Sequence, residues 1–135
     1  MCSGLAEENP LTIREFTYSV ARLNRDQYFR GYTFVVFKHH ATELYQLKKK
    51  EREGFMTEMV RMADALGGVF KPDKMNYELL GNKMPHLHWH LIPRYKSEPS
   101  WGEPVWSNEH FERRLSYKEY QKLIEQIQTK LSRDD

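Results

Sequence analysis

The stretch from His86 to Leu91 alternates strictly between histidine and a large apolar residue, and it holds three of the chain's six histidines. In a β-strand, residues at positions i, i+2 and i+4 point to the same face of the sheet. The pattern therefore predicts a strand over residues 86–92, with imidazoles in a row on one face and apolar side chains on the other. A fold that accepts this strand must offer a core to one face and leave the other face accessible.

The remaining patterns predict a single α+β domain built on a small antiparallel sheet. A helix over residues 48–66 is predicted because apolar residues recur at helical spacing from Phe55 to Leu66. Gly67 and Gly68 are expected to end this helix or to loosen its last turn. Only a short turn separates the final two strands, which favours antiparallel pairing. The other predicted elements are strands at 16–23, 31–37 and 74–80, a turn of helix at 42–45, a loop at 94–110 and a C-terminal helix at 116–132. Together they form a single domain, 1–135, with an irregular lead-in (1–13) and a C-terminal helical extension (111–135).

Composition and charge exclude several classes of protein. With 21 Lys and Arg against 19 Asp and Glu, the net charge of +2 is too balanced to require a nucleic-acid partner. No apolar run approaches the roughly 20 residues of a membrane span, and the N-terminus lacks the basic-then-apolar layout of a secretory signal. The one cysteine, Cys2, excludes an internal disulfide and a multi-cysteine zinc site. We therefore expect a cytoplasmic protein with no membrane or nucleic-acid partner.

A row of imidazoles has three interpretations. The rings could be tolerated on an exposed strand face without a function. They could bind a metal, although three in line fit a tetrahedron poorly because the outer two lie roughly 13 Å apart along the backbone. They could also act in nucleophilic catalysis, in which the middle ring attacks an electrophile while its neighbours set the tautomer and supply protons. The nearby residues favour this third interpretation, since backbone N–H groups of residues 81–84 and the amide of Asn76 could surround the oxygens of a phosphoryl group.

Residues 86–92, with Pro93-Arg94 after them, resemble the signature of the histidine triad (HIT) family, His-x-His-x-His with apolar spacers. The resemblance implies a small antiparallel α+β sheet, a homodimer, and a nucleotide cleaved or transferred at its α-phosphate through a covalent nucleotidyl-histidine. Other parts of the chain resemble a microbial branch of the family that is often called diadenosine tetraphosphate hydrolase-like. These parts are residues 26–31, 37–44, 71–77 and 101–102, and with the triad they cover roughly residues 16–106.

The resemblance also implies catalytic roles for individual histidines. His88 matches the middle histidine, which is the nucleophile of the family. His86 and His90 match the flanking histidines, which orient the nucleophile and assist proton transfer. His40 matches a further family histidine just after the second strand, and it is preferred over His39 because it keeps the family's spacing to the following leucine.

Four residues are expected to bind the nucleotide on the same grounds. Asn24 stands where some relatives place the residue that binds ribose. Asn76 resembles an asparagine on the phosphate side, with a one-residue difference in its distance to the triad. Asn82 and Lys83 stand where many relatives have glutamine and serine near phosphate, so this site is expected to hold phosphate with a cation.

The function expected from the resemblance is that of a nucleotide hydrolase or nucleotidyl transferase, acting on adenine dinucleotides such as diadenosine polyphosphates and releasing AMP. The nucleophile requires no cofactor, although Mg²⁺ could shield a polyphosphate substrate. No structural zinc is expected, because the Cys-x-x-Cys of many relatives is reduced here to Cys2. Two alternatives stay open: a nucleotide-binding sensor or scaffold with little turnover, and a metalloenzyme with histidine ligands. Trp101 and Trp106, in the loop after the triad, either pack against the sheet or stack on a base.

Overall fold

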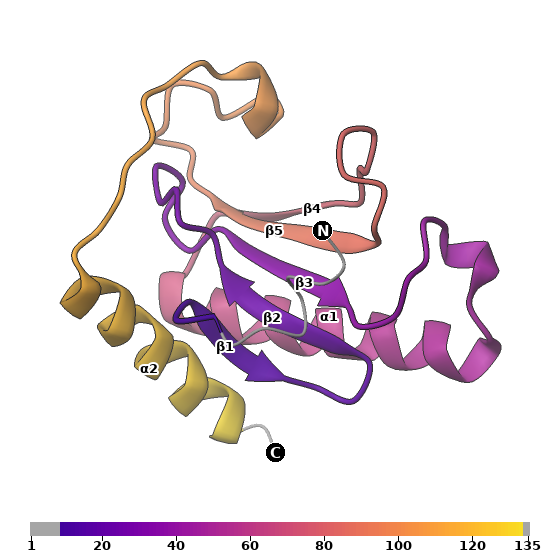
Figure 1. Cartoon of the computed structure of the whole chain (residues 1–135). Helices are drawn as coiled ribbons and strands as arrows, with labels where there is room; N and C mark the ends of the chain where they lie inside the picture. Colours follow the sequence, from indigo (N-terminus) through magenta and orange to yellow (C-terminus); the bar gives the residue numbers. More distant parts are fainter. Residues whose placement is uncertain (1–8, 134–135) are drawn as a thin grey trace.

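Within residues 9–133, which the computed structural model describes, the strands form one five-stranded antiparallel sheet with the order β1-β2-β3-β5-β4 (Figure 1). Two α-helices accompany the sheet in this part of the chain, so the predicted α+β class is confirmed. The elements are β1 (Thr12–Glu15), β2 (Ser19–Leu23), β3 (Thr33–Phe37), η2 (Leu44–Gln46), α1 (Lys49–Phe70), β4 (Lys74–Glu78), β5 (His88–Arg94), η3 (Val105–Ser107) and α2 (Tyr117–Arg133), where η marks a 3₁₀ helix.

The first two strands form a hairpin, where the pattern predicts one continuous strand over residues 16–23. β1 pairs with β2 after a tight turn, in which the backbone N–H of Phe16 donates to the carbonyl of Ser19 at 2.7 Å. β1 begins at Thr12, so the last two residues of the expected lead-in belong to the sheet. Residues 1–8 of that lead-in lie outside the described residues.

A buried carboxylate on α1 holds this hairpin turn in place. Glu58 accepts hydrogen bonds from the backbone N–H of Tyr18, at 3.2 and 3.1 Å to its two oxygens, and from the hydroxyl of Ser19 at 2.7 Å. Glu58 is 7% exposed, so these hydrogen bonds satisfy a charge that would otherwise be costly to bury. The partner lies 40 positions from Tyr18 in the chain, which is why the local pattern does not reveal the turn.

Helix α1 runs past the two glycines at which it was expected to end. It continues through Gly67 and Gly68 to Phe70 and closes at Lys71, whose left-handed backbone (φ 47°) lets its N–H donate to the carbonyl of Gly67 at 2.9 Å. A Cβ at position 68 would overlap the side chain of Lys130, so Gly68 gives room to helix α2 rather than ending α1. The predicted apolar stripe of α1 is buried, at Phe55, Met59, Met62, Ala63 and Leu66.

Helix α2 packs against α1 and β1 and closes the core at the β1 end of the sheet (Figure 1). Its Gln128 donates to the backbone carbonyl of Ile13 at 2.9 Å, which fixes the helix along β1. Burial of each large apolar side chain contributes about 1.5–3 kcal/mol to folding. No helix within residues 9–133 is long and apolar enough to cross a membrane. The buried residues of α2 are Tyr120, Leu123, Ile124, Ile127 and Leu131.

The chain between β5 and α2 extends beyond the sheet and then returns to α2 (orange in Figure 1). It carries the short helix η3, whose Val105 packs with Phe29 and Ile92 in a small second core. The predicted loop over residues 94–110 is therefore correct except for η3 and for Arg94, which is the last residue of β5. The segment is thus attached to the sheet rather than projecting freely from it.

Candidate active site

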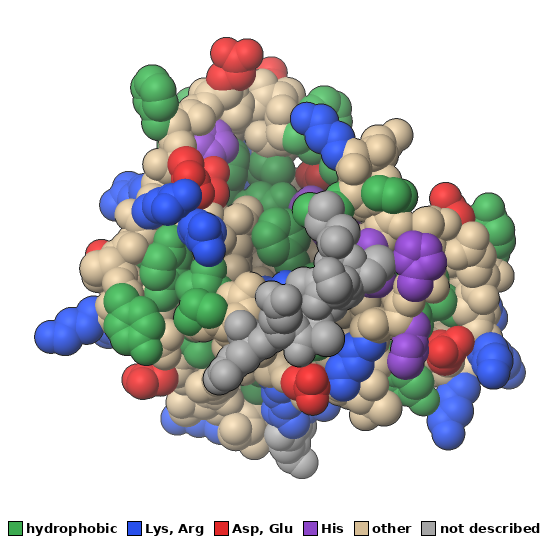
Figure 2. Space-filling view, viewed as in Figure 1, with side chains coloured by type: hydrophobic (Ala, Val, Ile, Leu, Met, Phe, Trp, Pro, Cys, Tyr) green, Lys and Arg blue, Asp and Glu red, His purple; other side chains and the backbone are tan. Residues whose placement is uncertain are grey.

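The side chains of β5 and the residue before it alternate between two environments. Leu87 and Leu91 are 3% and 0% exposed, and Trp89 packs against the same core as these two, together with α1. His88 and His90 are half-buried on the opposite face. Figure 2 shows histidine side chains gathered on one part of the surface. The predicted alternation is confirmed, but β5 begins at His88, so the row along the strand has two histidines rather than three.

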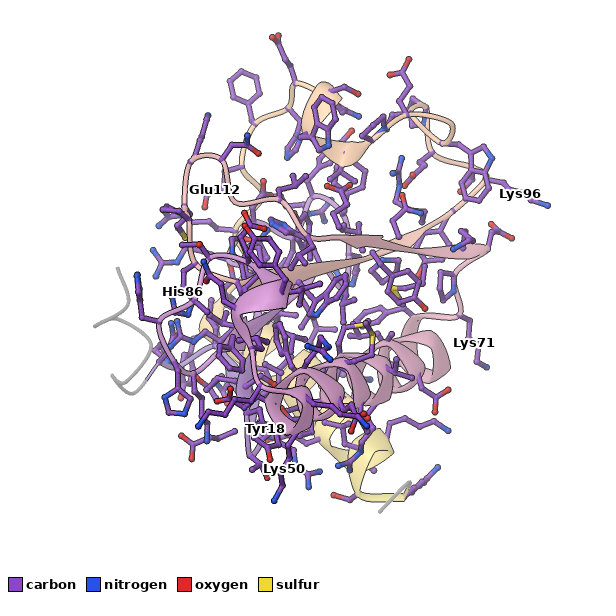
Figure 3. All side chains as sticks on the ribbon, turned by 90° about the vertical axis from the view of Figure 1, so that its right-hand side faces the viewer. Tyr18, Lys50, Lys71, His86, Lys96 and Glu112 are labelled. Atoms are coloured by element: carbon purple, nitrogen blue, oxygen red, sulfur yellow. The ribbon has the colours of Figure 1, made fainter. Side chains whose placement is uncertain are left out.

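His86 lies in the turn before β5, and only 4% of its surface is exposed. Its Nε2 lies 2.6 Å from the backbone carbonyl of Phe37 at the end of β3. A carbonyl oxygen only accepts, so Nε2 carries a proton and donates it. Backbone hydrogen bonds join the same turn to β3 and to the residue after His40: the N–H of Phe37 donates to the carbonyl of Leu87, and the N–H of Leu87 donates to the carbonyl of Ala41, both at 2.9 Å. The exposed His40 is brought to the same place, with the two ring centres 6.1 Å apart. Figure 3 shows His86 at the end of the sheet remote from Lys71 and Lys96.

His88 is the first residue of β5 and uses one ring nitrogen for a backbone contact. Its Nδ1 lies 2.6 Å from the carbonyl oxygen of His86. Since that oxygen only accepts, Nδ1 carries the proton of the neutral ring, and Nε2 then holds an unshared electron pair. The arrangement therefore presents Nε2 of His88 as a potential nucleophile.

His90 has a different partner at the same ring position. Its Nδ1 lies 2.6 Å from the hydroxyl oxygen of Tyr32, just before β3, and its ring centre lies 4.7 Å from that of His88. Burial, and to a smaller extent the neighbouring His88, lowers the pKa of His90 to about 4. The ring is therefore neutral at pH 7, and it adds no positive charge beside His88.

Asn76 lies on β4 and shares the histidine face. It pairs with Ile92 in the ladder, and directly paired residues of an antiparallel sheet point to the same face. Its side-chain oxygen accepts a hydrogen bond from Nη1 of Arg94 at 3.0 Å. This contact fixes the amide so that its NH₂ group is the part that can donate to a ligand. Sequence reasoning left open whether Asn76 faces the histidines, and the register now places it there.

Arg94 is a site residue that the sequence analysis treated only as a flank of the motif. Its guanidinium is 1% exposed and donates to the carboxylate of Glu98, to Asn76 and to the backbone carbonyl of Ser100, the last at 2.6 Å. It also lies over the ring of Phe29, 5.2 Å from the ring centre. The positive charge of Arg94 is thus paired, and its rigid, planar guanidinium fixes the orientation of the Asn76 amide.

Glu78 is a second residue that sequence reasoning missed. It pairs with His90 in the β4–β5 ladder and therefore lies on the histidine face. Burial raises the pKa of Glu78, although Arg94 opposes that effect, and its Oε2 is buried without a hydrogen-bond partner in the part of the chain that the structure describes. The signal was present in the sequence, because Glu78 follows Asn76 by two positions and must share its face.

The other three expected nucleotide-binding residues lie in two loops. Asn24 follows β2, where its side-chain oxygen accepts from the N–H of Asp26 at 3.1 Å and its own N–H donates to the carbonyl of Tyr32 at 2.9 Å. The structure thereby brings Asn24 beside the residue that contacts His90. Asn82 and Lys83 are exposed in the turn between β4 and β5. The roles of these residues in binding remain predictions.

The structure also locates the residues that were considered as metal ligands and as stacking partners of a nucleotide base. Among residues 9–133, no group of three or more His, Cys, Asp or Glu side chains is arranged to hold a metal ion, and Cys2 lies outside the described residues. A hollow of about 500 Å³ lies beside β4, and Trp101, Asn76 and Glu78 are among the residues that line it. Trp106 is 68% exposed, so it does not pack against the sheet as one interpretation proposed.

A family model for the HIT domain matches residues 6–97. The chain belongs to the HIT family. It is 27% identical over 111 residues to the protein hit of Bacillus subtilis, a match that covers 78% of this chain and 76% of that protein. The fold is similar to that of a histidine triad protein from Bradyrhizobium japonicum (TM-score 0.82, 28% identity, 89% of each chain covered). It is equally similar to a histidine triad protein from Marinobacter aquaeolei (TM-score 0.82, 25% identity, 97% and 94% covered). HIT proteins act on nucleotides, so the histidine face is the place to look for nucleotide chemistry.

Proposed function

We propose that this HIT protein is a nucleotide hydrolase or nucleotidyl transferase of the diadenosine tetraphosphate hydrolase-like branch. It acts at the α-phosphate of adenine dinucleotides, such as diadenosine polyphosphates, and releases AMP through a covalent nucleotidyl-His88 intermediate. The observation that carries the proposal is the 2.6 Å contact of His88 Nδ1 with the carbonyl of His86. It leaves the lone pair on Nε2, which is the form of imidazole that attacks phosphorus. Membership in a family that acts on nucleotides supports the substrate class.

The proposed reaction has two displacements at phosphorus. In the first, the lone pair of His88 Nε2 forms a bond to the α-phosphorus, and the bond from phosphorus to the leaving oxygen breaks. The leaving group takes a proton, for which His86 and His90 are the proposed sources; His90 supplies one only from its doubly protonated form, because the neutral ring has a single proton. In the second, water attacks the same phosphorus, the P–N bond breaks, AMP leaves, and the proton of the water replaces the one given up. The nucleophile needs no cofactor, and Mg²⁺ would act only by shielding a polyphosphate substrate.

The proposed contacts with substrate come from both sides of the histidine face. Asn24 would bind the ribose, and Asn76 would donate its NH₂ group to a phosphate oxygen. Asn82 and Lys83 would hold phosphate from the turn before the triad, with the lysine supplying a cation. His40 would act through His86, beside which it lies.

The test is chromatography of the products formed from a panel of adenine nucleotides: dinucleoside polyphosphates, an adenosine phosphoramidate, adenylyl sulfate and an adenylylated small molecule. Each is incubated with the wild type, with His88→Ala and with His39→Ala, with and without EDTA. His39 is an exposed histidine one position from His40, so His39→Ala is a matched control for loss of an imidazole.

We expect wild type and His39→Ala to release AMP and His88→Ala to release none. On a substrate that needs no Mg²⁺, the release should survive EDTA, because the nucleophile is not a metal-bound group. Loss of turnover in EDTA on such a substrate would favour the metalloenzyme alternative. Tight binding of nucleotides without turnover of any panel member would favour the sensor or scaffold alternative.

We further propose that the chain works as a cytoplasmic homodimer. β4 is an edge strand of the sheet, so one side of its backbone is unpaired within residues 9–133, and strands of this kind readily pair with another copy. The nearby Tyr77 and Leu80 are 48% and 50% exposed. Sedimentation equilibrium should give twice the chain mass of 16.3 kDa, and a monomer at micromolar concentration would contradict the proposal.

A further inference from the structure

The two histidines of β5 meet opposite kinds of group at Nδ1. His88 faces a carbonyl oxygen, which can only accept a hydrogen bond, whereas His90 faces the hydroxyl of Tyr32, which can donate one. Both contacts are 2.6 Å long. A neutral imidazole has one proton for two nitrogens, so the partner at Nδ1 decides which nitrogen holds it.

The hydroxyl of Tyr32 is held in place by its surroundings. The N–H of Tyr32 donates to the carbonyl of Phe29 at 3.1 Å, and its carbonyl accepts from the N–H of Asn24 at 2.9 Å and from Nε2 of Gln27 at 3.1 Å. Its ring packs against the small core of Phe29, Ile92 and Val105, and lies 5.4 Å from the ring of Phe34. The backbone and the ring are thus both fixed, and the phenol has little freedom to turn away from His90.

The protonation states of Tyr32 and His90 are also defined by their surroundings. Burial, followed by the negative charges of Glu78 and Asp26, raises the pKa of Tyr32, so the phenol keeps its proton at every physiological pH. The ring of His90 is neutral at pH 7 for the reasons given above, and His88 and Glu78 are the titratable groups that flank it in the sheet. Two neutral groups 2.6 Å apart share one hydrogen bond, which could run in either direction because a phenol hydroxyl both donates and accepts. A phenol is the stronger proton donor and an imidazole nitrogen the stronger acceptor, so the favoured direction is from oxygen to nitrogen.

We propose that Tyr32 is a positioning residue, whose hydroxyl donates to Nδ1 of His90 and so places that ring's only proton on Nε2. His88 and His90 then hold opposite tautomers on neighbouring positions of one strand face. His88 offers a lone pair at Nε2, and His90 offers an N–H donor at Nε2 for a phosphoryl oxygen. The tautomer follows from the contact and from the greater donor strength of the phenol, and its catalytic use rests on the function proposed above.

The experiment on the tautomer needs no substrate and uses the full chain. Uniformly ¹⁵N-labelled protein is examined by long-range ¹H–¹⁵N correlation, which distinguishes a protonated from an unprotonated ring nitrogen for each histidine. The spectra compare wild type, Tyr32→Phe, and Tyr45→Phe as a matched loss of a phenol hydroxyl from a side chain that is 80% exposed. His90→Gln identifies the signals of His90 by their disappearance.

In wild type and in Tyr45→Phe, His90 should show an unprotonated Nδ1 and a protonated Nε2 between pH 6 and 8, while His88 shows the reverse. In Tyr32→Phe, the His90 signals should move toward the average of the two tautomers, with the His88 signals kept. A proton on Nδ1 of His90 in wild type would overturn the proposal, and this result does not depend on how well the variant folds. His90 signals unchanged by Tyr32→Phe would also overturn it.

The catalytic consequence is measured separately. Tyr32→Phe should lower kcat about 10- to 100-fold with KM little changed, the range found when the hydrogen-bond partner that fixes the tautomer of a metal-bound histidine is lost, whereas Tyr45→Phe should keep both. An unchanged kcat with the tautomer lost would show that His90 is not used as a donor. The expected tautomers without any AMP release would contradict the proposed function and leave the role of Tyr32 standing.

Discussion

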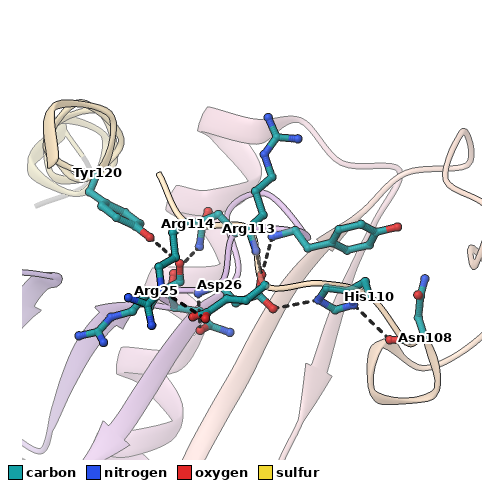
Figure 4. A network of polar contacts seen from close by, with 11 residues as sticks. Arg25, Asp26, Asn108, His110, Arg113, Arg114 and Tyr120 are labelled. Atoms are coloured by element: carbon teal, nitrogen blue, oxygen red, sulfur yellow. Dashed lines mark hydrogen bonds and ion pairs between the residues drawn. The ribbon is translucent and has the colours of Figure 1, made fainter. Parts of the chain in front are cut away.

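Histidine occurs in two contrasting settings in this molecule. On the sheet, His88 and His90 each use Nδ1 in one hydrogen bond, and Nε2 faces no partner within the described residues. In the second setting, both nitrogens of His110 are engaged: Nε2 lies 2.8 Å from Oδ2 of Asp26, and Nδ1 lies 3.1 Å from the carbonyl of Asn108 (Figure 4). Both of these partners only accept, so the ring makes both hydrogen bonds only when it carries two protons.

The difference separates the rings of the proposed catalytic site from a ring that joins two segments of the chain. His110 stacks on Tyr28 with ring centres 4.0 Å apart, and it joins the segment before α2 to the loop after β2. The neighbouring N–H of Arg113 donates to Asp26 as well, and the hydroxyl of Tyr120 reaches the same loop at the carbonyl of Arg25 (Figure 4). A ring with both nitrogens occupied can hold two segments together but has no lone pair to offer a substrate. The number and kind of partners, rather than the residue type, therefore decide the role.

The largest expected effect is the difference in activity between an alanine variant of a histidine on the sheet and one of His110. His88→Ala should reduce AMP release by a factor of roughly 10³ or more, because it removes the proposed nucleophile. His110→Ala should keep kcat within about twofold, since the ring touches none of the proposed catalytic groups, while the free energy of unfolding falls by about 1–3 kcal/mol. Steady-state kinetics and urea unfolding of both variants measure the contrast. Equal losses of activity in the two variants would abolish the distinction.

Asp26, the acidic partner of His110, allows the structural role of His110 to be tested through the pH dependence of the unfolding free energy. Burial alone would raise the pKa of Asp26, but hydrogen bonds from the N–H groups of Arg113 and Tyr28 and from His110 outweigh it and lower the pKa. A carboxylate with a lowered pKa stabilises the fold above its unfolded pKa of about 3.9, and this contribution is lost as pH falls through the folded value. Asp26→Asn should therefore cost about 1–3 kcal/mol of unfolding free energy at pH 7.

The difference between Asp26→Asn and wild type should begin to shrink below about pH 4, where the carboxyl of the unfolded chain becomes protonated, and should keep shrinking until the folded carboxyl is protonated as well. Urea unfolding at pH 7 and at pH 3 measures it. Asp64→Asn, at an exposed position of α1, is the matched control and should leave the stability unchanged. A variant as stable as wild type at pH 7 would mean that the network in Figure 4 does not hold the two segments together.

His90, in the setting on the sheet, should make the unfolding free energy depend on pH over a different range from that of Asp26. The folded pKa of His90 is about 4, below its unfolded value of about 6.5, so between these values the unfolded chain binds more protons than the folded one. This residue should thus make the protein lose about 1–2 kcal/mol as pH falls from 6.5 to 4, once solvent screening is allowed for. His90→Gln should flatten the unfolding free energy over that window, and His39→Ala should not. A slope retained in full by His90→Gln would assign it to another group.

Sequence patterns predict the parts of this fold that depend on near neighbours. The alternation from His86 to Leu91 predicts a strand with one buried face, and the helical spacing from Phe55 to Leu66 predicts the buried side of α1. What the patterns miss depends on distant partners. The hairpin turn before Ser19 requires Glu58, and the passage of α1 through its glycines depends on packing against α2.

The same division applies to the candidate site. The histidines and Asn76 were found from spacing and from the family resemblance, and the register brings Asn76 to the histidine face. Tyr32 could not be found in this way, because its contact with His90 joins residues 58 positions apart and a tyrosine before a strand is usually a packing residue. Glu78 was within reach, since strand alternation places it beside Asn76, and it was missed because only the amide was considered as a ligand for phosphate.

The stacking of Tyr28 on His110 should give the smallest effect. The rings lie 15° from parallel, and such pairs contribute about 0.5–1.5 kcal/mol beyond the area that they bury. Tyr28→Leu should lower the unfolding free energy by about that amount, whereas Tyr45→Leu, at a side chain that is 80% exposed, should have little effect. A double-mutant cycle with His110→Ala isolates the contact, because the loss from Tyr28→Leu should disappear when the imidazole is absent. Additive losses would show that the stack does not help to join the segment before α2 to the loop after β2. The hydrogen bonds of His110 alone would then distinguish it from the histidines of β5.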